Sequence, residues 1–435
     1  MNLTSRGIGL VMAAALLGAL GQWSAALGSF PWWRLAVALI ALGLLYELLM
    51  ARRVAVAARW RAAKHLLLGR PDTLRLEIAN GSHRALRVQA APTLPDALAP
   101  TGAALDVAEL HAGPGATAGA PVRIVPTRLG EHVWSKLPVR VRGPLGLAWW
   151  SRRLAPAGSV RVVPDTLGPK SAPAGSDASG SAAQASLGGA FELHHLRPYR
   201  PGDPRHTIDW KATARASRLI TRVYSEDQHL EIVIAVDAGR TGRTELDGIS
   251  QFGHYANLAS RFAEYCVSGD DQVGLVVFAD RTLAALPPGR GPAAVARIRR
   301  ALTNVEPQPV ESDVLEAALE VRRLVRRRCL VVVLTDLYER GGASRLVQTA
   351  RLLAPKHLPM MVGLVSTDAE DRANAPAADW LDPYVAIAAR DYRRQLGANV
   401  ARLTRLGAIA LTAHAADLDR LVLARYRALR ERHRV

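Results

Sequence analysis

Two long apolar runs open the chain, and they predict a pair of membrane helices. Residues 8–27 carry no charged side chain, and about 20 helical residues span the roughly 30 Å hydrocarbon core of a bilayer. After a break at residues 28–31, a second apolar run covers residues 35–50 and contains a single charge, Glu47. The competing interpretation is a cleaved signal peptide, which the length of the first run and the presence of the second disfavour. We therefore predict a transmembrane hairpin of two helices.

The basic residues around these runs predict how the hairpin is inserted. The turn between the runs offers only Arg34 as a basic residue, next to Trp32 and Trp33, whose rings suit the membrane interface. The basic residues that follow the second run are Arg52, Arg53, Arg59, Arg61 and Lys64. Because loops rich in Lys and Arg stay in the cytoplasm, both ends of the hairpin and all that follows are expected there. The predicted location is the inner membrane of a bacterial cell, with two passes and cytoplasmic soluble domains.

Short runs of alternating polarity follow, and they predict a small antiparallel β-sandwich over residues 65–165. Residues 73–79 alternate with a period of two, and Asn80-Gly81 after them suits a tight turn. Similar runs occupy residues 122–125, 139–141 and 160–163. This part shows no catalytic constellation. Gly, Ser, Ala and Pro then predominate over residues 166–190, a composition typical of a flexible linker.

The second half of the chain alternates apolar strands with helices and predicts an α/β domain. Strand-like runs occupy residues 230–237, 271–278, 329–334, 360–365 and 407–411. Helical patterns occupy residues 252–265, 293–302, 314–325, 390–405 and 418–430. The alternation is typical of a doubly wound, mostly parallel sheet. Ligands of such sheets bind beyond the carboxyl ends of the strands, where Asp237 and Asp336 would both lie.

Residues 191–222 differ from their flanks because they are dense in Arg, His, Asp and Trp. They read FELHHLRPYRPGDPRHTIDWKATARASRLITR. This closely resembles the hallmark of domain-of-unknown-function family 58, roughly E-F-x-x-L-R-x-Y-x-x-G-D-x-x-R-x-I-D-W-x-x-x-A-R. The residues that fit the pattern are Glu192, Leu196, Arg197, Tyr199, Gly202, Asp203, Ile208, Asp209, Trp210, Ala214 and Arg215. Two positions depart from it: Leu193 replaces Phe, and His206 replaces Arg, with Arg205 one place early.

The resemblance implies an organisation and a function for the whole chain, because the upstream β region and the hairpin are also similar to the family's. The expected parts are a hairpin with a basic juxtamembrane segment (1–64), a β-sandwich-like domain (65–165), a flexible linker (166–190), and the hallmark segment with a von Willebrand factor type A-like domain (191–435). Family members commonly pair with a MoxR-type AAA+ ATPase in assembly or maturation of other proteins. The implied function is a membrane-anchored scaffold or adaptor, not an enzyme, with an ATPase and an unidentified client as partners.

Type A domains often hold a divalent cation, so the resemblance also implies a degenerate metal site. Their D-x-S-x-S motif becomes Asp237-Ala238-Gly239-Arg240-Thr241 here, in which Gly239 lacks a hydroxyl and Arg240 adds a positive charge. The residues of a weakened Mg²⁺ site would be Asp237, Thr241, Ser312 and Asp336. The alternative is that these polar residues cap strand ends and helix N-termini without metal. Arg240 would then replace the cation by pairing with Asp336 or Asp313.

The hallmark segment has two interpretations. In the first, its charged residues form a network that locks the segment onto the sheet, with Trp210 packed beneath. In the second, it is a partner-binding surface. The candidate residues for either role are Glu192, Arg197, Tyr199, Asp203, Arg205, Asp209, Trp210 and Arg215.

Two rival functions remain open. His194, His195 and His206 would suit a metal-dependent hydrolase, but adjacent histidines diverge on regular structure, and the chain has no H-E-x-x-H motif. The other rival is a divalent-cation-dependent, adhesion-like protein-binding module without an ATPase partner.

The charge balance bears on partners, since 56 Lys and Arg against 38 Asp and Glu give a formal net charge of +18. Nucleic acid is not expected, because an aromatic share of 5% offers few stacking platforms. For a tethered chain, anionic lipid or an acidic partner explains the charge more simply. Cys266 and Cys329 lie in apolar contexts and are expected to be buried and free of a disulfide.

Overall fold

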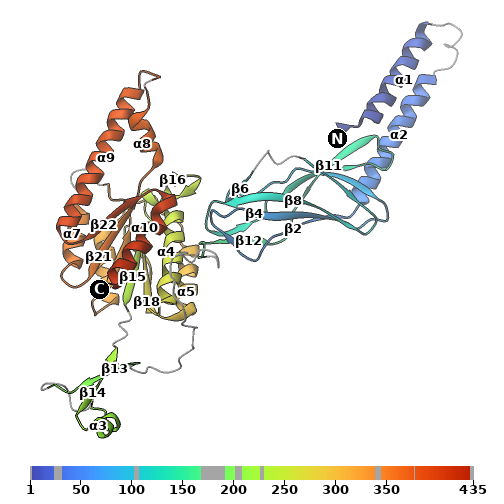
Figure 1. Cartoon of the computed structure of the whole chain (residues 1–435). Helices are drawn as coiled ribbons and strands as arrows, with labels where there is room; N and C mark the ends of the chain where they lie inside the picture. Colours follow the sequence, from blue (N-terminus) through green and yellow to red (C-terminus); the bar gives the residue numbers. More distant parts are fainter. Residues whose placement is uncertain are drawn as a thin grey trace.

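Two N-terminal helices, a β domain and an α/β domain follow one another along the chain in the computed structural model (Figure 1). The structure describes residues 2–23, 32–101, 107–167, 192–200, 208–225, 230–338, 344–376 and 378–431. Several separate sheets, the largest of six strands, make this a mixed α/β chain. Both cysteines are buried and free.

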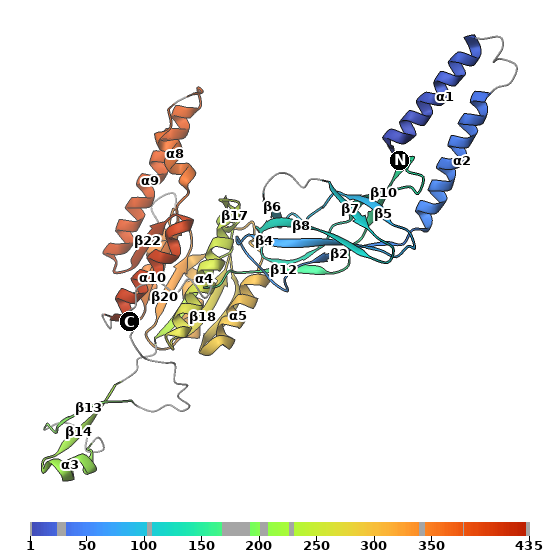
Figure 2. The ribbon, with the colours of Figure 1, turned by 45° about the vertical axis from the view of Figure 1, so that its right-hand side comes forward.

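The N-terminal helices α1 (Ser5–Trp23) and α2 (Trp32–Arg53) lie side by side in Figures 1 and 2. Within the described residues, one helix, Trp33–Arg53, is long and apolar enough to cross a membrane, and Ser5–Leu20 forms a shorter apolar helix. Large apolar side chains stand exposed along both helices, among them Leu16, Leu20, Leu39 and Leu42. The length and composition of α2 indicate membrane anchoring.

In the described residues of the β domain there are twelve strands. They are β1 (Asn2–Leu3), β2 (Val56–Arg61), β3 (Leu66–Leu67), β4 (Asp72–Asn80), β5 (Leu86–Ala90), β6 (Leu98–Pro100), β7 (Ala108–Ala112), β8 (Thr117–Pro126), β9 (Gly130–Val133), β10 (Leu137–Arg142), β11 (Ala148–Leu154) and β12 (Ser159–Val163). The sheets run β1-β11-β10-β5-β7, β2-β4-β8-β6 and β3-β12-β9. Alternate residues of β4 and β10 are buried in one common core, so the period-two pattern over residues 73–79 is confirmed as a strand.

The boundary between the hairpin and the β domain differs from the expected one. The juxtamembrane segment contains β2, which pairs antiparallel with β4, so the β domain takes in residues before position 65. Trp60 of this strand is 5% exposed and stacks on Trp134 with ring centroids 5.3 Å apart. Of the arginines that predicted a basic juxtamembrane segment, Arg52 and Arg53 end α2, whereas Arg59 and Arg61 are outward-facing residues of this strand.

The α/β domain is built on one six-stranded sheet in the order β19-β18-β15-β20-β21-β22. Its strands are β15 (Glu231–Asp237), β18 (Gln272–Phe278), β19 (Thr282–Gly289), β20 (Leu330–Leu334), β21 (Leu358–Leu364) and β22 (Ile409–Ala413). All neighbours pair in parallel except β19, which pairs antiparallel with β18 at the edge. The strands expected from apolar runs are therefore present, whereas β19 was not anticipated. Its two prolines are tolerated because it is an edge strand.

Helices cover both faces of this sheet. The α-helices described in this domain are α4 (Gln251–Ser268), α5 (Gly291–Asn304), α6 (Val314–Leu324), α7 (Ser344–Leu353), α8 (Thr367–Asn374), α9 (Asp382–Arg405) and α10 (Ala415–Glu431). Ile232 and Ile234 of β15 face a core with α4, α5 and α10, whereas Val233 faces a second core with α6, α7 and α9. Two buried faces explain why these strands read as unbroken apolar runs.

The β domain contacts the α/β domain through α4. Asn257 donates from Nδ2 to the Leu68 carbonyl at 3.2 Å, and its Oδ1 accepts from the Asp165 amide at 2.8 Å. Arg261 pairs with Asp165 at 2.6 Å. The expected linker over residues 166–190 lies mostly outside the described residues, although the Leu167 amide donates to Glu264 at 3.0 Å.

Candidate functional site

A cavity opens at the carboxyl end of the two central strands. β15 and β20 are parallel neighbours, so Asp237 at the end of one and Thr335 just beyond the other meet at this edge. The cavity has a volume of about 620 Å³. Its lining residues are Asp237, Arg240, Thr241, Glu311, Ser312, Val314, Thr335, Asp336, Tyr338, Arg345 and Leu346. All four residues predicted for the metal site therefore line one cavity.

Asp237 is the most constrained of these residues, with only 2% of its surface exposed. Its Oδ1 accepts from the Gly239 amide at 2.8 Å and from the Ser312 hydroxyl, and its Oδ2 accepts from the Thr335 hydroxyl at 2.6 Å. Burial raises the pKa of this carboxyl, and the three hydrogen bonds partly oppose that rise. The side chain is thus fixed in one orientation but is costly to keep ionised.

Gly239 is required at its position by the approach of Ser312. A Cβ at residue 239 would lie 2.0 Å from the Ser312 Oγ and 2.9 Å from the Val310 carbonyl oxygen. A serine at this position, as in the D-x-S-x-S motif, would therefore collide with the opposite loop. The hydroxyl missing from Gly239 is replaced by that of Ser312, which comes to Asp237 from a segment 75 residues away.

Asp336 is the second carboxylate at the cavity. Burial, together with the neighbouring Asp237 charge, raises its pKa to about 6, against a hydrogen bond to its Oδ1 from the Tyr338 amide at 2.9 Å. Thr241 lies in the short helix η2 (Thr241–Arg243) and is half-buried. With Glu311 included, three carboxylates and four hydroxyls line the cavity.

Arg240 does not take the role proposed for it in the metal-free alternative. It pairs with Glu311 at 3.1 Å, and both side chains are exposed. Asp313 is the N-cap of α6, where its Oδ1 accepts from the Leu315 amide at 3.0 Å. The expected pairing of Arg240 with Asp336 or Asp313 is therefore wrong, because the guanidinium pairs instead with Glu311 on the cavity rim.

The groups at this cavity that could coordinate a metal are all oxygens and fit a hard cation in kind, although the positively charged Arg240 and Arg345 line the cavity as well. The Ser312 and Thr335 hydroxyls donate their hydrogens to Asp237. A cation bound here would therefore be coordinated by the lone pairs of these two hydroxyl oxygens, beside the same carboxylate. Over the described ranges of the chain, no group of three or more His, Cys, Asp or Glu side chains gathers as a metal site. A Mg²⁺ site here depends on hydroxyl oxygens and stays a prediction.

The hallmark segment folds as a separate small unit. β13 (Glu192–Pro198) and β14 (Ile220–Ser225) pair antiparallel, and α3 (Trp210–Ala216) lies beside them (Figure 1). Asp209 caps α3, because its Oδ1 accepts from the amides of Lys211 and Ala212, each at 3.0 Å. Its own amide donates to the Ile220 carbonyl at 2.8 Å, and the Tyr199 amide donates to the Leu219 carbonyl at 2.9 Å.

Trp210 is not packed beneath the segment, contrary to expectation. It is 68% exposed, because α3 rests on the β13–β14 hairpin rather than on the six-stranded sheet. Arg215 is also exposed. Asp203, Arg205 and His206 lie outside the described residues, as do the side chains of Glu192, His194, His195 and Arg197. The charged network and the hydrolase hypothesis stay untested predictions.

Three polar residues of the cavity were not anticipated: Thr335, Tyr338 and Arg345. The sequence did contain a signal for Thr335, since this residue directly follows the apolar strand and precedes Asp336.

A second unanticipated feature is the hairpin of α8 and α9, which projects from the domain in Figure 1. Its exposed apolar residues are Trp380, Leu381, Tyr384 and Ile387. An exposed apolar cluster of this kind is typical of a contact surface.

A family comparison matches the part of the chain that contains both the hallmark hairpin and the cavity. The profile of the family described as "Protein of unknown function DUF58" covers residues 195–374. Residues 195–374 form a DUF58 domain. The matched part begins in β13 and ends in α8, so it excludes the N-terminal helices and the β domain.

Solved structures give weak likenesses to this chain. Proximal thread matrix protein 1 from the mussel byssus is 12% identical, with 44% of this chain and 45% of that chain covered and a TM-score of 0.30. Native alpha-2-macroglobulin of E. coli is 16% identical over 25% of this chain and 6% of that chain, at a TM-score of 0.18. A crystal structure of the same E. coli protein, from domain MG7 to the C-terminus, is 20% identical over 25% and 16%, at 0.19.

The chain spans less than half the length of each of these proteins, and the scores are too low to bear on its fold. A comparison with curated proteins finds no match.

Proposed function

We propose that this chain is a membrane-anchored adaptor that binds a partner protein at the cavity beside Asp237 and Asp336. The observation that carries the proposal is a pair of carboxylates with raised pKa values at an open cavity. Desolvated carboxylates cost folding free energy, and a binding site is where such a cost is offset. A positively charged group of a partner, or a bound cation, would offset it here.

The fold of the α/β domain supports a von Willebrand factor type A-like assignment. An aspartate ends the central strand β15, and hydroxyl side chains from two other segments turn toward it. In such sheets, ligands bind beyond the carboxyl ends of the strands, which is the edge where the cavity opens. The proposed role of the domain is to present this edge to its partner.

The partner that we propose is a MoxR-type AAA+ ATPase, acting with this chain in the assembly or maturation of a client protein. The family resemblance supports the ATPase. The apolar helices α1 and α2 support two passes through the bacterial inner membrane, and the basic residues after α2 support a cytoplasmic β domain and α/β domain. The hairpin would then keep the ATPase and client at the membrane.

A cation-dependent form of the same contact is the second candidate. The cavity donors are all oxygens, so Mg²⁺ held by Asp237, Thr241, Ser312 and Asp336 would leave a position for a carboxylate of the partner. In this form the chain would be an adhesion-like module, and chelation of the cation would release the partner.

Affinity capture of the detergent-solubilised chain from its native cells, with and without ATP, tests the proposal. The variants are Asp237→Ala and a matched control, Asp391→Asn, whose side chain is about half exposed on α9 and accepts from Arg394 at 2.7 Å. We expect a MoxR-type ATPase with wild type and the control, and at least a severalfold lower recovery with Asp237→Ala. A parallel arm with EDTA separates the cation-dependent form from the direct one.

Each outcome has a defined meaning. Recovery unchanged by Asp237→Ala would overturn the role of the cavity, while absence of any ATPase in all arms would overturn the partnership. Because Asp237→Ala leaves three buried donors without an acceptor, at roughly 1–3 kcal/mol each, circular dichroism of the purified variant must first confirm that it folds.

A further inference from the structure

A second cavity lies where the N-terminal helices meet the β domain. Its volume is about 630 Å³, and its wall combines the start of α1 and the end of α2 with β5, β10 and their loops. Five arginines line it: Arg6, Arg53, Arg84, Arg87 and Arg142. His83 lines it too, and no Asp or Glu is among its described lining residues. The cavity is therefore a concentrated positive site.

The part of the cavity wall that comes from the β domain is hydrogen-bonded to the helix pair. Glu47 of α2 is fully buried, and its carboxylate accepts from the amides of Leu147 at 2.9 Å and Ala148 at 3.0 Å. The Thr4 amide, just before α1, donates to the Leu147 carbonyl at 2.9 Å. A Cβ on Gly143 would lie 2.2 Å from the Glu47 carboxyl carbon, so the loop fits only as glycine.

The arginines of this cavity are not neutralised by the protein. None of the five forms an ion pair with a carboxylate in the part of the chain that the structure describes. Glu47 is occupied by backbone amides, and the Nε of Arg142 is buried with no hydrogen-bond partner. Arg84 donates only to the Tyr46 hydroxyl, at 3.4 Å. Four of the arginines are exposed to solvent, whereas the Arg142 Nε is a buried donor without a partner, so a bound anion would satisfy this donor and be attracted by the neighbouring charges.

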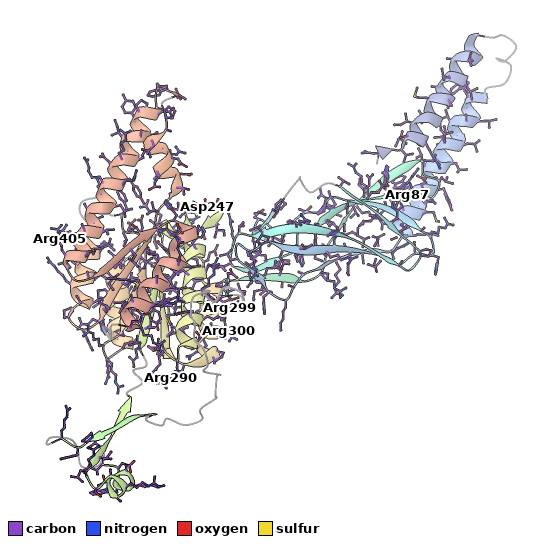
Figure 3. The ribbon with its side chains drawn as sticks, viewed as in Figure 1. Arg87, Asp247, Arg290, Arg299, Arg300 and Arg405 are labelled. Atoms are coloured by element: carbon purple, nitrogen blue, oxygen red, sulfur yellow. The ribbon has the colours of Figure 1, made fainter. Side chains whose placement is uncertain are left out.

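The position of the cavity indicates the source of that anion. Arg53 ends the apolar helix α2 and Arg6 lies in the first turn of α1, so the cavity is level with the point where both helices leave the apolar region. Figure 3 shows Arg87 at the end of the β domain that meets α2. Leu145, half-exposed, adds an apolar wall beside the arginines. Phosphate at the level of the helix ends is that of lipid headgroups.

We propose that this cavity binds the phosphate headgroup of an anionic phospholipid, and that the bound lipid fixes the β domain against the bilayer. The proposal rests on the membrane anchoring in the proposed function but not on the ATPase or the Asp237 cavity. Guanidinium groups bind phosphate oxygens through paired hydrogen bonds, and a basic pocket at the ends of membrane helices is suited to such headgroups.

Native mass spectrometry of the full chain in neutral detergent tests the proposal. The probes are phosphatidylglycerol, cardiolipin and phosphatidylcholine, with glycerol phosphate as a free anion. Arg87→Gln combined with Arg142→Gln removes two charges from the cavity. Arg52→Gln combined with Arg123→Gln removes two exposed charges outside it, one of them next to Arg53 on α2.

The expected result is preferential binding of phosphatidylglycerol or cardiolipin over phosphatidylcholine, weakened about tenfold or more in the cavity variant and little changed in the control. Equal weakening in both variants would overturn the proposal in favour of general surface attraction. Equal binding of phosphatidylcholine would also overturn it, and so would displacement of the lipid by millimolar glycerol phosphate. Extraction of the wild type from membranes by carbonate would instead contradict the membrane anchoring. Failure of the lipid site and failure of the anchoring are therefore distinguishable.

Discussion

Gly239 and Ser312 together decide the chemistry beside Asp237. Because a Cβ at position 239 would lie 2.0 Å from the Ser312 Oγ, the two residues must be chosen as a pair. The sequence alone placed Asp237 and Asp336 correctly at the strand ends, since each follows an apolar run. It could not place the Ser312 and Thr335 hydroxyls on Asp237, because those contacts join segments 75 and 98 residues apart.

Replacing Asp336 by Asn should change how stability depends on pH. Burial raises the pKa of Asp336 from 3.8 to about 6, so between these values the folded chain holds a proton that the unfolded chain releases. The stabilisation from this proton is present below about pH 4 and is lost as pH rises through 6. Asp336→Asn is therefore expected to be more stable than wild type at pH 8, by on the order of 2 kcal/mol.

Thermal unfolding of the full chain in detergent measures this difference. The midpoint of Asp336→Asn should exceed that of wild type by several degrees at pH 8, and the two should converge near pH 4. Asp391→Asn serves as the exposed control and should follow wild type throughout. A gain for Asp336→Asn that is the same at both pH values would show that ionisation is not the cause.

Strands that are buried on both faces of the sheet were the easiest elements to predict. Apolar runs located β15, β18, β20 and β21, because strands covered on two faces need apolar side chains throughout. The edge strand β19 and the juxtamembrane strand β2 were missed. Each is half-exposed, and in β2 the outward arginines obscured the inward Val56, Ala58 and Trp60.

The contact between α2 and the loop before β11 can be tested by enlarging Gly143. Gly143→Ala places a methyl group 2.2 Å from the Glu47 carboxyl carbon, so the loop must move and the Leu147 and Ala148 amides should lose their acceptor. We expect hydrogen exchange at these two amides to accelerate at least about tenfold, which corresponds to losing roughly 1.4 kcal/mol of protection.

Gly113→Ala is the matched control, because a Cβ there meets only Ala116 Cβ at an ordinary 3.7 Å. Exchange at Leu147 and Ala148 that is unchanged in Gly143→Ala would mean that Glu47 does not hold this loop.

In the whole molecule, each end of the chain has its own proposed task. We propose that the apolar helices and the arginine cavity hold the protein at the bilayer, and that the cavity beside Asp237 receives a partner. The β domain joins these ends, with the Glu47 contact on one side and the contact of Leu68 with Asn257 of α4 on the other. A partner bound at the α/β domain would therefore be kept close to the membrane.

Site-specific photo-crosslinking at the cavity rim tests this account most directly. A photoreactive residue is placed at position 240, where Arg240 is exposed on the rim, and as a control at position 300, where Arg300 is exposed on α5. Illumination of native membranes should cross-link a MoxR-type AAA+ ATPase from position 240 and not from position 300. Equal cross-linking from both positions, or none from position 240, would contradict the assignment of this cavity as the partner-binding site.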